Sequence, residues 1–179
     1  MDSLILRAAK LAAQAHEGQT RKYTNRPYVE HPARVAGRVA LRPDATEDMV
    51  AAAFLHDVVE DTEIKLEDIR SILNPEVARL VGEMTNTSKI TDPKLPRAER
   101  KKMDRDRLAQ VSYEVKIIKL LDRIDNVREM TGAPSGFIRI YAEESLLLAT
   151  VIGDADIELK KELIEAATDL LGENIKRAM

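Results

Sequence analysis

The 179-residue sequence contains no cysteine, and this absence removes several classes of protein at once. Disulfide frameworks, thiol catalysis, zinc fingers and iron–sulfur clusters all need cysteine, so histidine and carboxylate side chains must supply any metal site. A long apolar run is also missing, and the first 15 residues mix Lys and Arg with Leu and Ala. The sequence therefore predicts neither a signal peptide nor a membrane span, and a cytoplasmic location is expected.

Aromatic residues, glycine and proline are scarce as well, with two Phe, four Tyr, no Trp, seven Gly and seven Pro. Abundant Ala, Leu, Glu, Lys and Arg favour helix, because straight-chain residues lose little rotamer freedom there. A hydrophobic content of 44% and a charged content of 33% fit one globular domain. We therefore predict a single all-α domain over residues 1–179.

No excess of positive charge is present, because 28 basic residues stand against 31 acidic ones and the net charge is −3. This balance argues against nucleic acid as a partner. A small polyanionic ligand would instead need a local cluster of basic side chains.

Apolar residues recur at helical spacing and are separated by Pro and Gly. Residues 85–96 are polar, contain two prolines and are expected to form a long loop, where function often concentrates. The pattern predicts helices over residues 3–17, 32–40, 47–60, 66–73, 75–86, 97–110, 113–130, 138–152 and 156–179.

The predicted helix 47–60 has an unusual end. It is apolar on every side between Val50 and Leu55, so it is expected to be buried, yet ionisable residues follow. On a continuous helix these groups would lie in two adjacent stripes. Burying them without partners is costly, and crowded carboxylates raise one another's pKa, so a divalent cation among them is expected. The four groups are His56, Asp57, Glu60 and Asp61.

Two further candidate ligands come from other predicted helices. Asp122 interrupts the apolar stripe of helix 113–130, and His31 precedes Pro32 at a predicted helix start, where the backbone is rigid. A His–Asp dipeptide alone is weak evidence, because a core histidine with satisfied hydrogen bonds is the commoner explanation. The mixed imidazole and carboxylate set suits Mn²⁺, Fe²⁺ or Zn²⁺, and octahedral Mn²⁺ would keep positions open for water. The set is His31, His56, Asp57 and Asp122.

The whole pattern resembles the H…HD…D signature of HD-domain phosphohydrolases. More narrowly, several segments look like the hydrolase domain of RelA/SpoT proteins, and the likeness runs from about Ala8 to Glu129. The short chain resembles the stand-alone small alarmone hydrolases of the metazoan SpoT type. The segments are Arg21-Lys22, PYVEHP at 27–32, AFLHDVVEDT at 53–62, LPRAERK at 95–101 and KLLDRIDN at 119–126, which is similar to the family's KLADRLHN.

The resemblance implies an HD-domain fold and Mn²⁺-dependent removal of the 3′-pyrophosphate from guanosine tetra- and pentaphosphate, giving GDP or GTP plus pyrophosphate. It also implies substrate contacts by Arg21 and Lys22, in a loop before the first ligand, and by Arg97. An arginine plane can stack on a base, and a lysine can meet phosphate as a point charge. Carried over residue by residue, the resemblance implies metal ligands His31, His56, Asp57 and Asp122 and catalytic residues Glu60, Asp61 and Asn126.

Two departures from the family pattern leave the substrate open. Residues 82–86 lack the lysine that many RelA/SpoT hydrolases have there, and Glu129 stands where the long enzymes commonly have threonine. An adenosine alarmone or the 2′-phosphate of NADPH is therefore an alternative substrate. An alternative of another class is a regulatory module that binds a nucleotide without turnover. The presence of both Glu60 and Asp61 counts against this alternative.

Overall fold

The computed structural model describes residues 2–178, apart from the side chains at positions 89, 90, 131, 177 and 178. Within this range the chain is helical, with one isolated antiparallel bridge between Thr20 and Pro27 and no strand. The all-α prediction is confirmed. The helices are α1 (Leu4–Ala15), α2 (Glu30–Ala40), α3 (Glu47–Phe54), α4 (Val58–Asp61), α5 (Leu66–Ile72), α6 (Pro75–Met84), α7 (Ser88–Thr91), α8 (Arg97–Leu108), α9 (Tyr113–Arg128), the 3₁₀-helix η1 (Met130–Gly132), α10 (Ser135–Ile152) and α11 (Ile157–Ala178).

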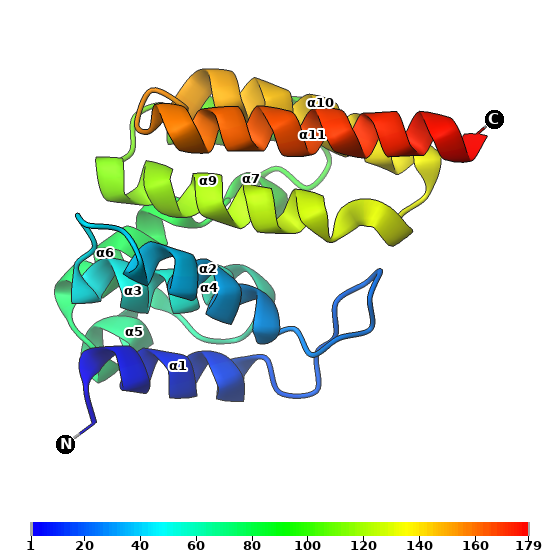
Figure 1. The fold of residues 1–179 in the computed structure, drawn as a ribbon. Coiled ribbons are helices and arrows are strands. Elements are labelled where there is room, and N and C mark those ends of the chain that lie inside the picture. Colours follow the sequence, from blue (N-terminus) through cyan, green and yellow to red (C-terminus); the bar gives the residue numbers. More distant parts are fainter. Residues whose placement is uncertain (1, 179) are drawn as a thin grey trace.

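The helices lie in two groups that meet at α9 (Figure 1). α9, α10 and α11 are stacked along one side of the molecule, and α1 to α6 lie along the other. α9 packs against α2, α3 and α6 in one direction and against α10 and α11 in the other. Ten of its 16 residues are buried, so the polar side chains among them must find partners inside the protein.

The largest difference from the sequence prediction lies at the end of α3. The helix expected over residues 47–60 stops at Phe54, and residues 55–57 form a turn before the short α4. At this point the backbone changes to tighter hydrogen bonds three residues back, from the Leu55 amide to the Ala52 carbonyl and from the Val58 amide to the Leu55 carbonyl. His56 Nδ1 donates to the Ala53 carbonyl at 2.8 Å within this turn. The expected geometry of two helical stripes is therefore wrong, and His56 and Asp57 lie on a turn.

Smaller differences affect the ends of other helices. α2 begins at Glu30 rather than Pro32, so His31 lies within the first helical turn. The expected loop 85–96 contains one turn of helix, α7. The final helix begins at Ile157, and its predicted end at Met179 lies outside the described residues.

The loop between α1 and α2 is held against the far end of α9. It leaves α1 through Gly18, whose φ of +74° is a backbone conformation that side-chain-bearing residues rarely adopt. At its tip the Tyr23 carbonyl oxygen lies only 2.9 Å from the place where a Cβ at position 132 would lie, so Gly132 allows this close approach. The loop thereby brings Arg21 and Lys22 to the end of α9.

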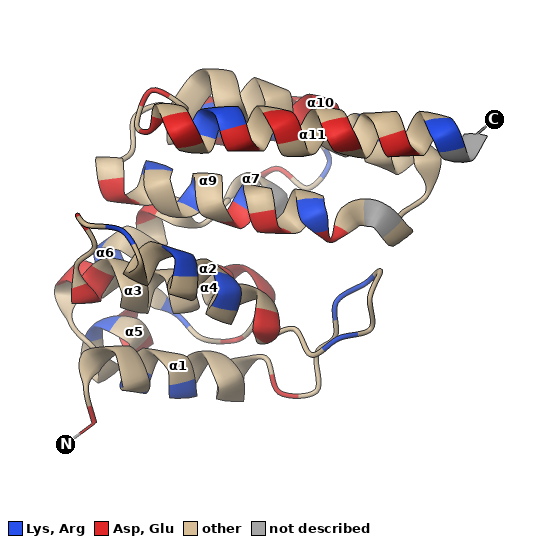
Figure 2. Cartoon of the chain, viewed as in Figure 1, with Lys and Arg blue, Asp and Glu red and all other residues tan. Residues whose placement is uncertain are grey.

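Charged residues of both signs occur along the chain. Figure 2 shows both signs of charge on most of the helices, in keeping with the small net charge. Among residues 2–178, no helix combines the length and the apolar character that crossing a membrane requires.

Candidate metal centre and substrate cleft

Four side chains predicted as metal ligands converge in the protein interior. α2 supplies His31, the turn after α3 supplies His56 and Asp57, and α9 supplies Asp122. The two histidine Nε2 atoms are 3.1 Å apart. Asp122 Oδ1 lies 3.2 Å from His31 Nε2, and Asp57 Oδ2 lies 3.1 Å from His56 Nε2. Both histidines are fully buried, so the cluster is shielded from solvent on the histidine side.

The donor set fits a divalent metal ion. Nitrogen and oxygen ligands bind such ions at about 2.0 to 2.2 Å, which places neighbouring ligand atoms about 3 Å apart around one centre. His31 Nδ1 lies 2.6 Å from Asp125 Oδ2, and His56 Nδ1 lies 2.8 Å from the Ala53 carbonyl oxygen. These acceptors hold a proton on Nδ1, so Nε2 is the nitrogen through which each ring would bind a metal ion.

Electrostatics keep the two ligand carboxylates ionised. Burial alone would raise the pKa of Asp57 and Asp122, but His56 in the first case and Lys119 with His56 in the second hold each pKa well below its usual range. Burial alone would lower the pKa of His56, but the two carboxylates outweigh it and raise this pKa. Lys119 Nζ lies 2.8 Å from Asp122 Oδ2 and is itself buried. The carboxylates are thus held in the form that binds metal.

Asp125 supports the cluster from behind and was not singled out in the sequence. Its Oδ2 accepts from His31 Nδ1, and Arg34 forms a two-pronged ion pair with it, at 2.8 Å for each contact. Burial would raise the pKa of Asp125, but the contacts with His31 and Arg34 lower it to about 2. A sequence signal did exist, because Asp125 is a second carboxylate one helical turn beyond Asp122 in an apolar helix.

We expect Asp125→Asn to weaken metal binding by about 10- to 100-fold, the usual cost of losing a partner of a ligating histidine. The amide can present its NH₂ group to His31 and so destabilise the tautomer that leaves Nε2 free. A metal titration of the stripped variant measures the effect. An affinity equal to that of the wild type would show that Asp125 does not orient His31.

Tyr28 connects the ligand cluster to the acidic pair. Its hydroxyl donates to Asp57 Oδ2 at 2.7 Å and lies 3.2 Å from Asp61 Oδ2. Burial, followed by the two nearby carboxylates, raises the pKa of Tyr28, so the hydroxyl keeps its proton and remains a donor.

Glu60 and Asp61 lie at the edge of the cluster on the short α4. Glu60 Oε1 accepts a hydrogen bond from the backbone N–H of Asn86 at 2.6 Å. Burial raises the pKa of Glu60, and the Lys119 charge only partly offsets this effect. Asp61 is exposed and contacts Tyr28. The two carboxylates therefore occupy different environments although they are adjacent in sequence.

A cleft of ≈ 320 Å³ opens beside the cluster, and Asn126 belongs to both. Asn126 donates from Nδ2 to Asp122 Oδ1 at 2.5 Å and accepts from Arg21 Nη2 at 2.6 Å. Arg21 also pairs with Glu129 through Nε at 2.7 Å, so its guanidinium is fixed at the cleft wall. We call this space the nucleoside cleft; its lining residues are Thr20, Arg21, Lys22, Tyr23, Thr24, Tyr28, Asn126, Glu129, Met130, Phe137 and Tyr141.

The other two residues predicted to contact the substrate, Lys22 and Arg97, lie at or near this cleft, and of the two only Arg97 has an ion-pair partner among the described residues. Lys22 is exposed, and its Nζ lies 5.3 Å from the Tyr23 ring centroid. Arg97 forms a two-pronged ion pair with Glu144, at 2.8 and 2.9 Å, and lies 5.3 Å from the ring centroid of Phe137, a cleft residue. Arg97 therefore borders the cleft with an anionic partner already in place.

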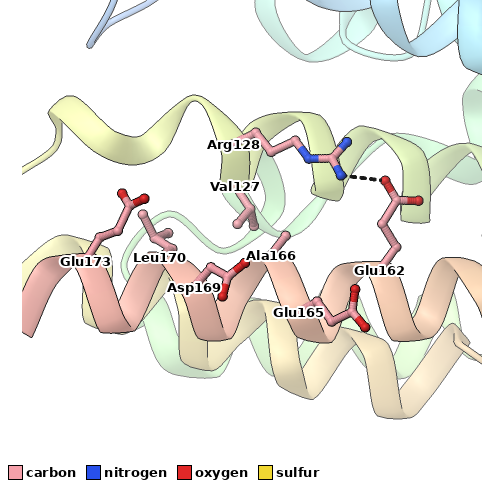
Figure 3. A pocket seen from close by; sticks show the side chains of 8 residues that line it. All are labelled: Val127, Arg128, Glu162, Glu165, Ala166, Asp169, Leu170 and Glu173. Carbon is pink, nitrogen blue, oxygen red and sulfur yellow. Dashed lines mark ion pairs between the residues drawn. The ribbon is translucent and has the colours of Figure 1, made fainter.

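A second surface hollow, of ≈ 250 Å³, lies between α9 and α11 and is lined mainly by acidic side chains (Figure 3). Among the described residues that line it, Arg128 is the one cation, and it pairs with Glu162 at 2.8 Å. The acidic lining residues are Glu162, Glu165, Asp169 and Glu173. A polyphosphate would be repelled there, so the nucleoside cleft is the better candidate for a nucleotide.

Comparisons with known proteins agree with this geometry. Residues 8–151 match the HD domain family. The Drosophila melanogaster guanosine-3′,5′-bis(diphosphate) 3′-pyrophosphohydrolase MESH1 is 32% identical over 176 residues, which cover 93% of this chain and 96% of that protein. The Homo sapiens protein of the same name is 36% identical over 144 residues, covering 78% and 77% of the two chains.

Solved structures show the same likeness. A structure described as a metazoan orthologue of SpoT that hydrolyses ppGpp matches with a TM-score of 0.79 and 29% identity, over 94% of this chain and 96% of the other. A Listeria monocytogenes structure, lmo0812, matches with a TM-score of 0.65 and 26% identity, over 84% and 99%. With its buried histidine and aspartate cluster and a family match over most of its length, this chain belongs to the HD domain family.

Proposed function

We propose that this chain is a metal-dependent hydrolase that removes the 3′-diphosphate from guanosine tetra- and pentaphosphate, releasing pyrophosphate and GDP or GTP. The observation that carries the proposal is the buried group of His31, His56 and Asp122, with Asp57 beside it, joined to the nucleoside cleft through Asn126. The activity named for the MESH1 relatives supports the same substrate.

In this proposal the metal ion is Mn²⁺, which suits a mixed nitrogen and oxygen set with positions left for water and phosphate. When bound, the ion lowers the pKa of a water molecule and neutralises charge on the phosphate under attack. Around it, Tyr28 and Lys119 hold the ligand carboxylates and Asp125 orients one imidazole. The ligands are His31, His56, Asp57 and Asp122.

Glu60 and Asp61 are proposed as the pair that moves protons. The water oxygen forms a bond to the phosphorus next to the sugar O3′, and the bond between that phosphorus and O3′ breaks. A carboxylate takes the water proton, and O3′ leaves as a hydroxyl after it receives a proton. Burial raises the pKa of Glu60, which makes this carboxyl a better proton carrier near neutral pH. Asn126 is proposed to position the reacting groups, since it connects Asp122 with Arg21.

Arg21, Lys22 and Arg97 are proposed to bind the nucleotide rather than the metal. Arg21 is oriented by Glu129 and Asn126, so its planar guanidinium can face a purine in the nucleoside cleft at little entropic cost. Lys22 is free to meet a phosphate, and Arg97 adds positive charge at the Phe137 side of the cleft. None of the three lies within the ligand cluster.

We expect Arg21→Ala to raise KM by about 10-fold while bound metal stays unchanged, the scale of one desolvated cation–π contact. Arg21→Lys should not restore KM, because an ammonium group cannot stack as a plane. Arg26→Ala is the matched control, since Arg26 lies in the same loop, is exposed and pairs only with Glu30 among the ion pairs of the described residues. Native KM values in both Arg21 variants would exclude a substrate contact.

The substrate is tested by comparing kcat/KM for guanosine tetraphosphate, its adenosine analogue and NADPH under the same Mn²⁺ concentration. We expect the guanosine compound to be preferred and pyrophosphate to be released. A preference for NADPH with release of orthophosphate would overturn the proposal. Tight binding without turnover of any of the three compounds would instead identify a nucleotide-sensing module.

We further propose that residues 1–179 act as one HD-type domain in the cytoplasm on a small-molecule nucleotide, without nucleic acid or membrane as partner. The packing of α11 against both α9 and α10 supports a single unit. The net charge of −3 supports a small ligand over nucleic acid.

A further inference from the structure

One arginine of α2 bridges two acidic residues at the end of α9. Arg34 donates from Nε to Asp125 Oδ1 and from Nη2 to Asp125 Oδ2, at 2.8 Å for each contact. Nη2 also donates to Glu129 Oε1. The other terminal nitrogen, Nη1, lies 3.8 Å from Glu30 Oε2. We call Arg34, Asp125 and Glu129 the arginine brace, because one guanidinium holds two carboxylates that are one helical turn apart.

The two carboxylates need a cation between them. The side chains of Asp125 and Glu129 are 11% and 15% exposed, so water screens their repulsion poorly. Like charges at this spacing on a helix destabilise it, and negative charge at a helix C-terminus is also unfavourable. The guanidinium of Arg34 compensates both charges, and its planar fork fixes the positions of both carboxylates.

Each carboxylate of the arginine brace also holds a residue of the proposed site. Asp125 Oδ2 accepts from His31 Nδ1 at 2.6 Å, and His31 is a predicted metal ligand. Glu129 Oε2 accepts from Arg21 Nε at 2.7 Å, and Arg21 lines the nucleoside cleft. Arg34 is therefore connected to the metal cluster through one carboxylate and to the cleft wall through the other.

Arg34 itself lies outside the nucleoside cleft. It is not among the residues described as lining that cleft, and it borders instead a surface hollow of ≈ 670 Å³ between α2 and α9. Glu129 borders both spaces, so Arg21 approaches it from within the cleft and Arg34 from the outer hollow. Arg34 would therefore act on a bound nucleotide through Glu129 and not by contact.

Both acidic members of the arginine brace depart from the family segments that the sequence resembles. Asp125 occupies the position of the histidine in KLADRLHN, and Glu129 stands where the long enzymes commonly have threonine. A neutral histidine and a threonine would not need a cation between them. The arginine brace is therefore a feature of this sequence that the resemblance does not supply.

We propose that Arg34 is a positioning residue that sets the affinity of this chain for both the metal ion and the nucleotide. It orients His31 through Asp125 and Arg21 through Glu129, so both are held in place before their ligands arrive. Binding then removes less conformational freedom from these side chains, which strengthens it. The inference rests on the proposed function.

The first test titrates the stripped protein with Mn²⁺ by calorimetry. Arg34→Ala should weaken Mn²⁺ binding by about 10-fold, the lower end of the cost of losing a supporting residue around a metal site. In the Asp125→Asn background the same substitution should change the affinity by no more than about 2-fold, because its effect runs through Asp125. Native affinity in Arg34→Ala, or a further 10-fold loss in the double variant, would contradict the inference.

The second test measures binding of GDP at saturating Mn²⁺. Arg34→Ala should weaken GDP binding by about 10-fold, the scale expected for loss of the Arg21 contact itself. The double variant Arg21→Ala/Arg34→Ala should bind GDP as Arg21→Ala does, within about 2-fold. Additive losses would show that Arg34 does not act through Arg21 and would overturn the inference.

Arg38→Ala is the matched control for both titrations. Arg38 lies one turn beyond Arg34 on α2, and its side chain is 30% exposed against 33% for Arg34. It pairs with Glu162 of α11 instead of the two acids of α9. Both affinities should stay at the wild-type value in this variant.

Arg34→Lys separates charge from geometry and decides alone, in the same two cycles, if Arg34→Ala does not fold. An ammonium group compensates charge but lacks the planar fork, so the thermal unfolding midpoint should recover while neither affinity does. Recovery of both affinities would contradict a positioning role. If both cycles behave as expected but guanosine tetraphosphate is not hydrolysed, the proposed function is wrong and the inference stands; hydrolysis with additive losses in both cycles would show the reverse.

Discussion

Replacing Asp122 with asparagine is expected to remove the bound metal and to lower kcat/KM by at least ~10³-fold. Loss of a residue that only hydrogen-bonds to a metal ligand already lowers metal affinity or activity by about 10- to 100-fold, and Asp122 is itself a predicted ligand. Asp122 is the ligand that α9 contributes, and its Oδ1 lies 3.2 Å from His31 Nε2. Its other oxygen neutralises the buried Lys119. An amide has no charge for either the metal or the lysine, so both functions are weakened.

Metal content of the purified protein measures the effect directly, and the thermal unfolding midpoint shows whether the fold persists. The matched control is Asp106→Asn, which removes a carboxylate that is 64% exposed and pairs with Lys102 at the surface. The control should keep both metal and activity. Normal metal occupancy and normal turnover in Asp122→Asn would exclude Asp122 from the metal centre.

Glu60→Gln and Asp61→Asn should keep the metal but slow turnover by about 10²-fold or more, the usual contribution of general acid–base catalysis. Both residues lie on α4 beside the cluster, and neither belongs to the group of closely spaced ligand atoms from His31, His56 and Asp122. Each amide keeps the shape of the side chain but cannot accept a proton in the working pH range. The defect should therefore appear in kcat and leave metal binding unchanged.

Glu63→Gln controls for the loss of one negative charge near α4, because Glu63 is exposed and lies just beyond the helix. Its kcat should match that of the wild type. If Glu60→Gln and Asp61→Asn also turn over at the wild-type rate, the pair serves the fold and the proton-transfer step requires other groups.

Three of the four ligand candidates could be found from the sequence because they are polar residues placed where an apolar pattern predicts burial, and His31 was found from its position before Pro32 at a predicted helix start. Asp122 interrupts the stripe of α9, and His56-Asp57 follow a stretch that is apolar all round. The structure brings these residues and His31 together, although they come from three separate segments. Their roles as ligands stay a prediction that metal analysis must test.

The break after α3 could not be predicted from periodicity, because apolar residues run from Val50 to Leu55 and resume at Val58 and Val59, a pattern that a continuous helix also gives. In the turn that follows the helix, His56 donates to the Ala53 carbonyl, and this bond depends on how the imidazole is oriented at the cluster. A pattern of apolar and polar residues carries no information on that orientation.

Contacts between residues far apart in the sequence could not be predicted from the sequence either. Asp125 contacts His31 across 94 positions, and Arg97 contacts Glu144 across 47. A single sequence identifies such residues as charged but does not say which charge each one meets. The supporting residues around the metal cluster therefore emerge only from the folded chain.

The central claim is that this chain hydrolyses guanosine tetraphosphate with a bound metal ion, and removing and restoring the metal tests it most directly. The purified protein is stripped with a chelator, titrated with Mn²⁺ and assayed for the products of guanosine tetraphosphate. We predict no turnover without metal, full activity at about one bound ion per chain, as expected for one four-ligand centre, and pyrophosphate as the phosphorus-containing leaving product. Full activity in the stripped protein, or release of orthophosphate in place of pyrophosphate, would contradict the account.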